Sequence, residues 1–498
     1  MKISTSYRAF IPAFLIVVTF LFSTVSVASD MNKGDTLTLD LKTVMKAALE
    51  YNHALKVSRL TPLTAKESIH VAASLFDPQV SVTGNTSDQE SWDESNGSST
   101  LQLSSEASVS KKMETGTSYS ISLTAGETDS ETDWDGDIGG SYLQTTASIS
   151  QPLMKNKGQE VNLRNVTLAE HEFRKSEIEF TQSMMDTISQ AQNLYWNHYS
   201  ALESLTVYEK SLTLAQRFIK EVEEKVRIGN AARLDILQAR SEVASREADI
   251  ITAQNDVYNT ADTLLTYIYG EAGVDIACNS LPAVPAMTEI KFNETQLINQ
   301  ALRLRTDHQT ADIDIESADV DLVYYENQTK PDLTLDAAMG INDGHPDNEA
   351  FASGDLENYY YGKVGITLKF PWGLQGEKAN LAAAKLSKRQ REISRNAVRS
   401  QIVLDVRTAF RDLKAAVKRY ETTQIASNYA EESLDAEQVK FRNGLSTSYN
   451  VLLYQRDLTD VRVQELDALI ACQTALIALH QAVGNTLEVN DIELASAQ

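Results

Sequence analysis

The chain has 498 residues, more than one ordinary core needs, so several domains or one extended repeat body are expected. Its formal net charge of −24 argues against a nucleic-acid partner, because phosphate binding needs clustered lysines and arginines. The two cysteines, Cys278 and Cys472, would pair only if the fold brought them together, and they are too few for a cysteine-rich zinc site.

The first 28 residues predict an export signal. Lys2 and Arg8 precede a mostly apolar stretch, and Ser26-Val27-Ala28 forms a plausible cleavage site. The alternative is an uncleaved membrane anchor, which the small residues at the end of the stretch disfavour. No later apolar run reaches about 18 residues, so no further transmembrane helix is expected and any membrane crossing would use a β-barrel.

Two stretches, 29–277 and 291–488, carry the same landmarks in the same order, which predicts an internal repeat. A proline-bearing linker at 278–290 separates them, and 489–498 forms a tail. The alternative is two unrelated helical hairpins. The paired landmarks are Ala48-Leu49 with Ala301-Leu302, Gln151-Pro152-Leu153 with Phe370-Pro371-Trp372, Tyr195 with Phe410, Gly229 with Gly444, and Asp235-Ile236-Leu237 with Asn450-Val451-Leu452.

Each repeat is predicted to run helix, strands, long helix, helix. A first helix, at about 41–75 or 294–328, ends before Asp77-Pro78 or Lys330-Pro331, since the residue before proline disfavours the helical conformation. The long helical hairpins follow at 158–270 and 376–484, each turning at a glycine. A proline-free run of about 70 residues would form a rod of about 100 Å.

The long helices carry seven-residue spacing that changes phase, which suits a helix with a neighbour on each side, as in a cylinder wall. The alternative is a long helical bundle without a lumen.

The strand regions, about 79–151 and 332–371, alternate with period two in segments of about 8–12 residues, the length that a membrane barrel strand needs. The loops between them are acidic and are expected to be solvated and external; calcium binding by their alternating aspartates is the less favoured alternative. A small soluble sheet with an aromatic core is the alternative to barrel strands. The aromatic residues near the strand ends are Trp92, Tyr119, Trp134, Tyr142, Tyr359, Tyr360, Tyr361, Phe370 and Trp372.

No catalytic constellation is present in the sequence. The seven histidines form no paired metal spacing on a helix face, and neither a nucleophile elbow nor a phosphate-binding loop stands out. We therefore expect no enzyme activity, no catalytic residue, no metal site and no cofactor. A secreted hydrolase, one alternative class, lacks any readable site.

Two segments, 226–240 and 441–452, place Asp-Ile-Leu or Asn-Val-Leu six residues after a helix-ending glycine. With Gln151-Pro152-Leu153 before a long helix and the duplicated order of elements, they resemble the TolC family of outer membrane efflux proteins. The resemblance covers residues 37–488, and its strength comes from the order of the motifs.

The resemblance implies an α+β membrane protein: a trimeric outer-membrane β-barrel continued by a long periplasmic α-helical barrel. It implies the exit duct of a tripartite efflux or type I secretion system, in the outer membrane and extending into the periplasm. The implied partners are two further copies, outer-membrane lipid, a periplasmic adaptor (membrane fusion) protein and an inner-membrane pump of the RND or ABC type. The alternative is a periplasmic coiled-coil scaffold or adaptor without a channel.

In the family, the hairpin tips form the periplasmic entrance and dock the adaptor. Carried over to this sequence, the entrance comprises Arg227, Ile228, Gly229, Asn230, Asn443, Gly444 and Leu445. Possible gate residues follow each tip, namely Arg233, Asp235, Asn450 and Leu453.

The sequence departs from the family in two places. Well-studied members carry cation-binding aspartates just after the second tip, where this chain has Asn450 and Leu453, so no acidic ring is carried over there. Asp235 is kept at the first tip, where a carboxylate favoured by the helix dipole is the alternative to a gate. Members usually give two strands per repeat, but 101–125 predicts an added hairpin, either in the wall, for eighteen strands per trimer, or a surface flap, for twelve.

Overall fold

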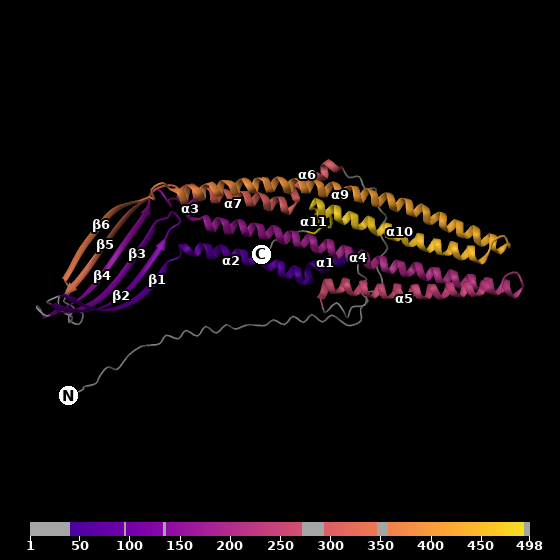
Figure 1. Cartoon of the computed structure of the whole chain (residues 1–498), viewed down its shortest axis with the longest axis horizontal. Helices are drawn as coiled ribbons and strands as arrows, with labels where there is room; N and C mark the ends of the chain where they lie inside the picture. The colour runs from indigo at the N-terminus through magenta and orange to yellow at the C-terminus, as the bar shows by residue number, and fades with distance from the viewer. Residues whose placement is uncertain (1–39, 94–95, 133–135, 271–292, 346–356, 493–498) are drawn as a thin grey trace, which may run out of the picture.

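The computed structural model describes residues 40–93, 96–132, 136–270, 293–345 and 357–492 as one elongated body. The strands stand at one end, and long helices run from there to the other end, where two helical turns lie (Figure 1). The predicted signal, the linker, Cys278 and the side chains of Trp92, Trp134 and the loop aspartates 133, 135 and 137 lie outside this description.

The predicted first helix of each half is broken into two, so the expectation of one continuous helix was wrong. The first half has α1 (Leu41–Tyr51) and α2 (His53–Ala73), followed by a 3₁₀ turn (Ser74–Phe76). At the break, Asn52 accepts a hydrogen bond from the Leu55 N–H (2.9 Å) and donates one to the Tyr267 carbonyl (2.8 Å). An asparagine that caps a new helix and reaches another element favours a break over a straight rod.

The second half breaks at Arg305, between α6 (Glu294–Leu304) and α7 (Thr306–Gln328). Its guanidinium pairs with Asp307 on α7 (2.7 Å) and with Asp405 on a neighbouring long helix (3.4 Å). The Arg305 break therefore sits where three helical segments meet.

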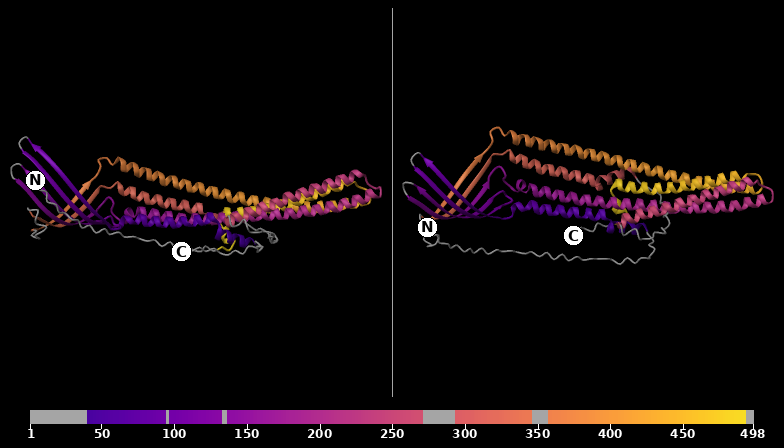
Figure 2. Two further views of the ribbon diagram at one scale, coloured as in Figure 1. Left: turned by 90° about the horizontal axis from the view of Figure 1, so that it is seen from below. Right: turned by 60° about the horizontal axis from the view of Figure 1, so that its bottom comes forward.

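Two antiparallel helical hairpins form most of the body (Figure 2). The first consists of α4 (Arg164–Arg227) and α5 (Arg233–Tyr269), after a four-residue α3 (Gln159–Asn162) that delays the long helix beyond its expected start at 158. The second consists of α9 (Gln375–Arg442) and α10 (Ser448–Val483), followed by α11 (Thr486–Val489). The 64 residues of α4 correspond to a rise of about 96 Å.

By length and composition, α10 could cross a membrane, whereas no such apolar run was expected from the sequence. Its most apolar 18-residue window has a mean hydropathy of 1.4, and 44% of it is buried inside the molecule. Because α10 packs along α9 and against α4, contacts within the chain cover part of its apolar surface.

All described strands form one antiparallel sheet in sequence order. They are β1 (Gln79–Asp93), β2 (Asn96–Lys112), β3 (Ser118–Thr132), β4 (Gly136–Pro152), β5 (Asp332–His345) and β6 (Glu357–Lys369). They span 13 to 17 residues and are therefore longer than the predicted 8–12. The added hairpin is β2 and β3, which lie inside the sheet between β1 and β4.

Residues paired across the strands give the sheet one apolar and one hydroxyl-rich face. The long helices extend away from the sheet rather than over it (Figure 2). The apolar face stays exposed, with Val80, Ile121, Met339 and Val364 among its large side chains. This arrangement does not fit the alternative of a soluble sheet whose aromatic residues fill a core, because none of the described helices or strands covers this face.

Candidate functional site

The two helical turns at the end remote from the sheet share one backbone geometry. At the first tip, Gly229 has φ of 80°, its N–H bonds the Val226 carbonyl (3.1 Å), and the next N–H bonds the Lys225 carbonyl (2.8 Å). At the second tip, Gly444 has φ of 79° and makes the equivalent pair of bonds at 3.1 and 2.9 Å. This is the Schellman arrangement, in which glycine takes the left-handed conformation that closes a helix end.

The predicted entrance residues form the surface of these turns. Ile228 and Leu445 are exposed apolar side chains, and Asn230 and Asn443 are exposed as well. Arg227, the last residue of α4, pairs with Glu224 one turn earlier at 2.5 Å, and both side chains are mostly exposed. An exposed pair of this kind contributes little to stability.

Of the predicted gate residues, Asp235 makes the most contacts. One carboxylate oxygen accepts the Ala232 N–H at the start of α5 (2.8 Å), and the other accepts the hydroxyl of Ser448 on α10. Ser448 is buried. Asp235 is therefore a helix-start carboxylate, as one of the two alternatives predicted, and it also links the two hairpins; its role as a gate residue stays a prediction.

The other three predicted gate residues lie apart from that link. Arg233 and Leu453 are exposed. The Asn450 side chain donates to the Ser446 hydroxyl (3.4 Å), and that hydroxyl donates to Glu437 on α9. Asn450 thus belongs to a network that closes the second tip on itself.

Glu437 is the acceptor at the centre of that network. Its carboxylate also pairs with Lys440 at 3.1 Å. The Ser446 hydroxyl, followed by Lys440, lowers the pKa of Glu437. The carboxylate therefore stays ionised near neutral pH and holds the turn around Gly444.

Lys225 and Phe441 join the long helices of the two hairpins just before the tips. The Lys225 ammonium donates to the Phe441 carbonyl and lies 3.9 Å from the centre of the Phe441 ring. The same ring lies 5.2 Å from that of Phe218 on α4, in an apolar layer that includes Val222 and Val451. Close to the tips, the two hairpins thus pack as one body.

A buried carboxylate two turns into α5 makes a further link. Glu242 is 2% exposed and binds Arg246 of its own helix (2.7 Å) and Arg456 of α10 (2.8 Å). Burial alone would raise the pKa of Glu242, but the hydrogen bonds and charges of the two arginines outweigh it and lower the pKa. Glu242 therefore remains an ionised bridge between the hairpins.

Sequence reasoning did not identify the residues that join the hairpins. The sequence did carry one signal for Glu242. Glu242 lies seven residues after Asp235, so the two side chains share a helix face, and Arg246 follows one turn later at the spacing of a helical ion pair. Ser448, Lys225 and Arg456 carry no comparable signal, since their partners lie more than 200 residues away in the chain.

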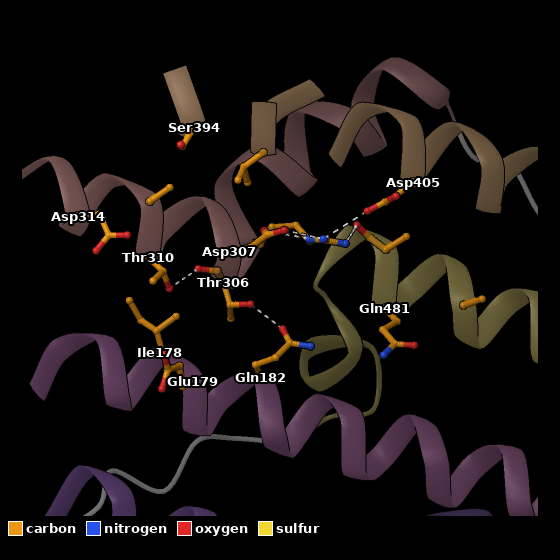
Figure 3. Close-up of a pocket in the computed structure, with 15 residues that line it drawn as sticks. Ile178, Glu179, Gln182, Thr306, Asp307, Thr310, Asp314, Ser394, Asp405 and Gln481 are labelled. Carbon is orange, nitrogen blue, oxygen red and sulfur yellow. Dashed lines mark hydrogen bonds and ion pairs between the residues drawn. The ribbon is translucent and has the colours of Figure 1, made fainter. Parts of the chain in front are cut away.

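A cavity lies away from the tips, beside the Arg305 break (Figure 3). It measures about 660 Å³ and is lined by α4, α7, α9 and α10. The Thr306 hydroxyl donates to the Gln182 side chain across it (2.6 Å). Its best-defined polar groups, Arg305 with its two aspartates and Thr306 with Gln182, are already paired with one another. Among the described residues, no group of three or more His, Cys, Asp or Glu side chains could hold a metal ion.

A sequence model described as "Outer membrane efflux protein" matches residues 119–268 and 297–485, more than half of the chain. The chain belongs to this outer membrane efflux protein family. It is accordingly an outer-membrane transport protein that extends into the periplasm, and it is not an enzyme.

Individual proteins agree with the family assignment. The chain is 23% identical to outer membrane protein TolC of Vibrio cholerae over 325 residues, which cover 65% of this chain and 73% of that protein. Its fold is similar to that of CusC, with a TM-score of 0.66, 18% identity and coverage of 90% and 93% of the two chains. It is also similar to the CmeC outer membrane channel of Campylobacter jejuni, with a TM-score of 0.65, 14% identity and coverage of 92% and 87%.

The fold is therefore that of TolC-like channels, rich in helix and with one sheet. The efflux channel is the function that the family assignment supports, whereas a channel-free periplasmic scaffold is not.

Proposed function

We propose that three copies of this efflux protein form one duct, in which the sheets close into a shared barrel and the helices continue it as a tunnel. The tips form its periplasmic entrance, which docks an adaptor and thereby an RND- or ABC-type pump of a tripartite efflux or type I secretion system. In this proposal the two halves of the chain are internal repeats. The observation that carries the proposal is that both lateral sides of the chain expose surfaces able to bind another copy: unpaired strand edges on the sheet and apolar side chains on the helices.

The sheet has an unpaired edge on each lateral side. Among the described strands, β1 pairs only with β2, and β6 only with β5, so both edges keep unpaired backbone groups. Long exposed edges invite pairing with another chain. Pairing β1 of one copy with β6 of the next removes both edges, and a head-to-tail contact of this kind closes into a ring. Three copies is the number typical of the family.

The helices also expose apolar side chains on each lateral side. On α5, Leu237, Ala244, Ile251 and Tyr258 are exposed at seven-residue intervals. On α9, at the other side, the exposed apolar side chains are Leu386, Ile393, Leu404, Ile425 and Val439. Regular apolar stripes at coiled-coil spacing favour helix packing between neighbouring copies.

Adaptor docking is supported by the exposed apolar side chains of the tips. Ile228 and Leu445 point into solvent at the very end of the body, together with Leu234 and Tyr449. A cluster of this kind marks a protein contact site more often than a solvated turn. The links through Asp235 and Glu242 would hold the tips together until the adaptor binds.

The net charge favours cations within the duct, since fixed negative charge raises the local cation concentration. A reversal potential across a salt gradient that indicates anion preference would exclude this part of the proposal.

Single-particle imaging of the detergent-extracted protein tests the proposal as a whole. A three-fold rod with a lumen along its helical part is expected. A monomer that needs no detergent, or a solid bundle, would show that the chain does not form a duct.

Adaptor docking has its own test. Ile228→Asp and Leu445→Asp are expected to abolish copurification of the adaptor while leaving the trimer intact. Lys220→Asp is the matched control, because it places the same side chain on an exposed part of α4 two turns before the tip. Equal loss of the adaptor in the control and in the tip variants would remove the docking assignment.

A further inference from the structure

We propose that β2 and β3 are wall strands, so that the outer-membrane part of the duct is an eighteen-stranded, hydroxyl-lined pore for solutes too large for a twelve-stranded one. The inference rests on the proposed three-chain duct. It concerns the class of cargo that the barrel admits, which neither the family nor the similar structures specify for this chain.

The first argument is the pairing of the added hairpin. β2 pairs with β1 from Gln79↔Ser110 to Asp93↔Asn96, and β3 pairs with β4 from Ser118↔Ser150 to Thr132↔Gly136. β2 and β3 also pair with each other over their shared length. A flap would leave β1 free to pair with β4, but here the hairpin separates these two strands completely.

The second argument is that the apolar face continues across the hairpin. Directly paired residues in an antiparallel sheet share a face, and one such row runs across the strands. Its members are Val80, Val109, Ile121, Ala147 and Met339. Val109 and Ile121, from the added strands, are exposed as well, at 46% and 60%. Such a surface suits lipid, whereas a flap in water would keep it exposed without benefit.

The third argument is the opposite face, where hydroxyls form ladders. Ser81 and Ser108 share a hydrogen bond of 2.8 Å across β1 and β2, and Ser120 and Ser148 share one of 2.6 Å across β3 and β4. The ladder continues into β5, where the Ser150 hydroxyl donates to Asp336 (2.6 Å). A polar face behind an apolar one is the pattern of a strand between lumen and lipid.

The turn that joins the added strands is also fixed, at the end of β4 and at the connection from β4 to α3. Thr117 is buried, and its hydroxyl donates to the Gln151 side chain (2.5 Å). The Gly158 N–H donates to the Thr115 carbonyl (3.1 Å). Gly116 has φ of 95°, and a Cβ there would lie 2.4 Å from the Asn156 carbonyl oxygen. A hairpin held this closely at its base is not free to swing out of the sheet.

The consequence is a wider pore. Barrel diameter grows roughly linearly with strand number, so eighteen strands give about 1.5 times the diameter of twelve and about 2.2 times the cross-section. With strands about 4.8 Å apart and tilted by about 40°, the backbone diameter would be about 36 Å rather than about 24 Å. We infer that size selection lies at the helical entrance and that large hydrated solutes or unfolded polypeptide pass the barrel.

Cysteine labelling in lipid vesicles tests the wall position. In a Cys278→Ser background, Ser108→Cys should react with a membrane-impermeant maleimide, whereas Val109→Cys should react at least about tenfold more slowly, because a lipid-covered thiol does not ionise. Ser122→Cys and Ile121→Cys provide the same contrast in β3. Equal, fast labelling of both members of a pair would show a flap and overturn the inference.

Polymer exclusion tests the width. The largest polyethylene glycol that enters from the outer side should be about 1.5 times wider for the full chain than for a variant lacking residues 96–132, in which β1 meets β4 with the same faces aligned. If the full chain and the shortened variant both form conducting trimers with the same polymer size limit, the wide pore is overturned but the proposed duct is not. Absence of trimers or of conductance in the full chain would instead remove the proposed function. If the shortened variant does not fold, the labelling pairs still decide the question.

Discussion

Replacing Glu242 by glutamine should loosen the helical tips more than any exposed substitution near them. Glu242 is almost fully buried and joins α5 to α10 through Arg456 while neutralising Arg246 on its own helix. Glutamine has nearly the same shape, so the variant removes the charge and leaves the packing in place.

The magnitude follows from the exposure of the two arginines. The Arg246 side chain is only 9% exposed, and it would lose its closer, buried partner and keep only Asp249 at 3.3 Å, whose side chain is 37% exposed. Removing one partner of a buried ion pair costs about 3 kcal/mol. Arg456 is mostly exposed, so solvent screens its ion pair with Glu242, and the loss of that pair costs less than about 1 kcal/mol. We therefore expect a local loss of about 3 kcal/mol.

Hydrogen exchange measures this local effect directly. A loss of about 3 kcal/mol corresponds to roughly 100-fold faster exchange of the amides near both tips, while the sheet end should not change. Glu247→Gln is the matched control, because Glu247 is exposed on the same helix. Adding Arg246→Met to Glu242→Gln should restore much of the protection, since the unpaired charge is gone. Equal exchange in Glu242→Gln and Glu247→Gln would refute the reasoning.

Three further outcomes are expected. Gly444→Ala should lower stability by about 1 kcal/mol because φ is 79° there, whereas Gly376→Ala, inside α9, should not lower it; thermal melting compares the two. Gly116→Ala should lower the melting temperature more than Gly158→Ala, since both have positive φ but only the former meets backbone within 2.4 Å. The lowered pKa of Glu437 means that its stabilisation is complete above the pKa of an unfolded carboxyl, about 4.3, and is lost as pH falls through the lower folded value. Exchange near the second tip should therefore rise below about pH 4, and Glu437→Gln should remove that dependence.

The sequence predicted best those features that depend on neighbouring residues. Gly229 and Gly444, chosen as helix-ending residues, are the residues with positive φ at the two tips. The segments 119–125 and 143–149, in which alternate residues were predicted to share a face, lie on strands β3 and β4, with the apolar side chains on one face. Each of these signals is local, because a turn or a strand face is determined by residues within a few positions.

The features that the sequence missed depend on contacts between distant segments. Nothing around Asn52 distinguishes a helix break from a polar residue inside a helix until the Tyr267 carbonyl is placed beside it. The link from Asp235 to Ser448 joins positions 213 residues apart. Helical periodicity identifies the face on which such residues lie but not the side chain opposite, so the bonds that join the tips could not be derived from it.

The added hairpin shows how the barrel can widen while the helices stay in place. β1 leaves the helical end of the sheet, β2 returns to it and β3 leaves it again, so β4 still returns to the helices in the direction that β2 has. The turn between the added strands ends beside the β4–α3 connection, where Thr117 bonds Gln151 and the Thr115 carbonyl accepts the Gly158 N–H. No helix has to be added or moved for these two strands. In the proposed trimer, the width of the barrel and the closure of the tips are consequently set by separate parts of the chain, the first by residues 96–132 and the second by contacts such as that of Glu242 with Arg456.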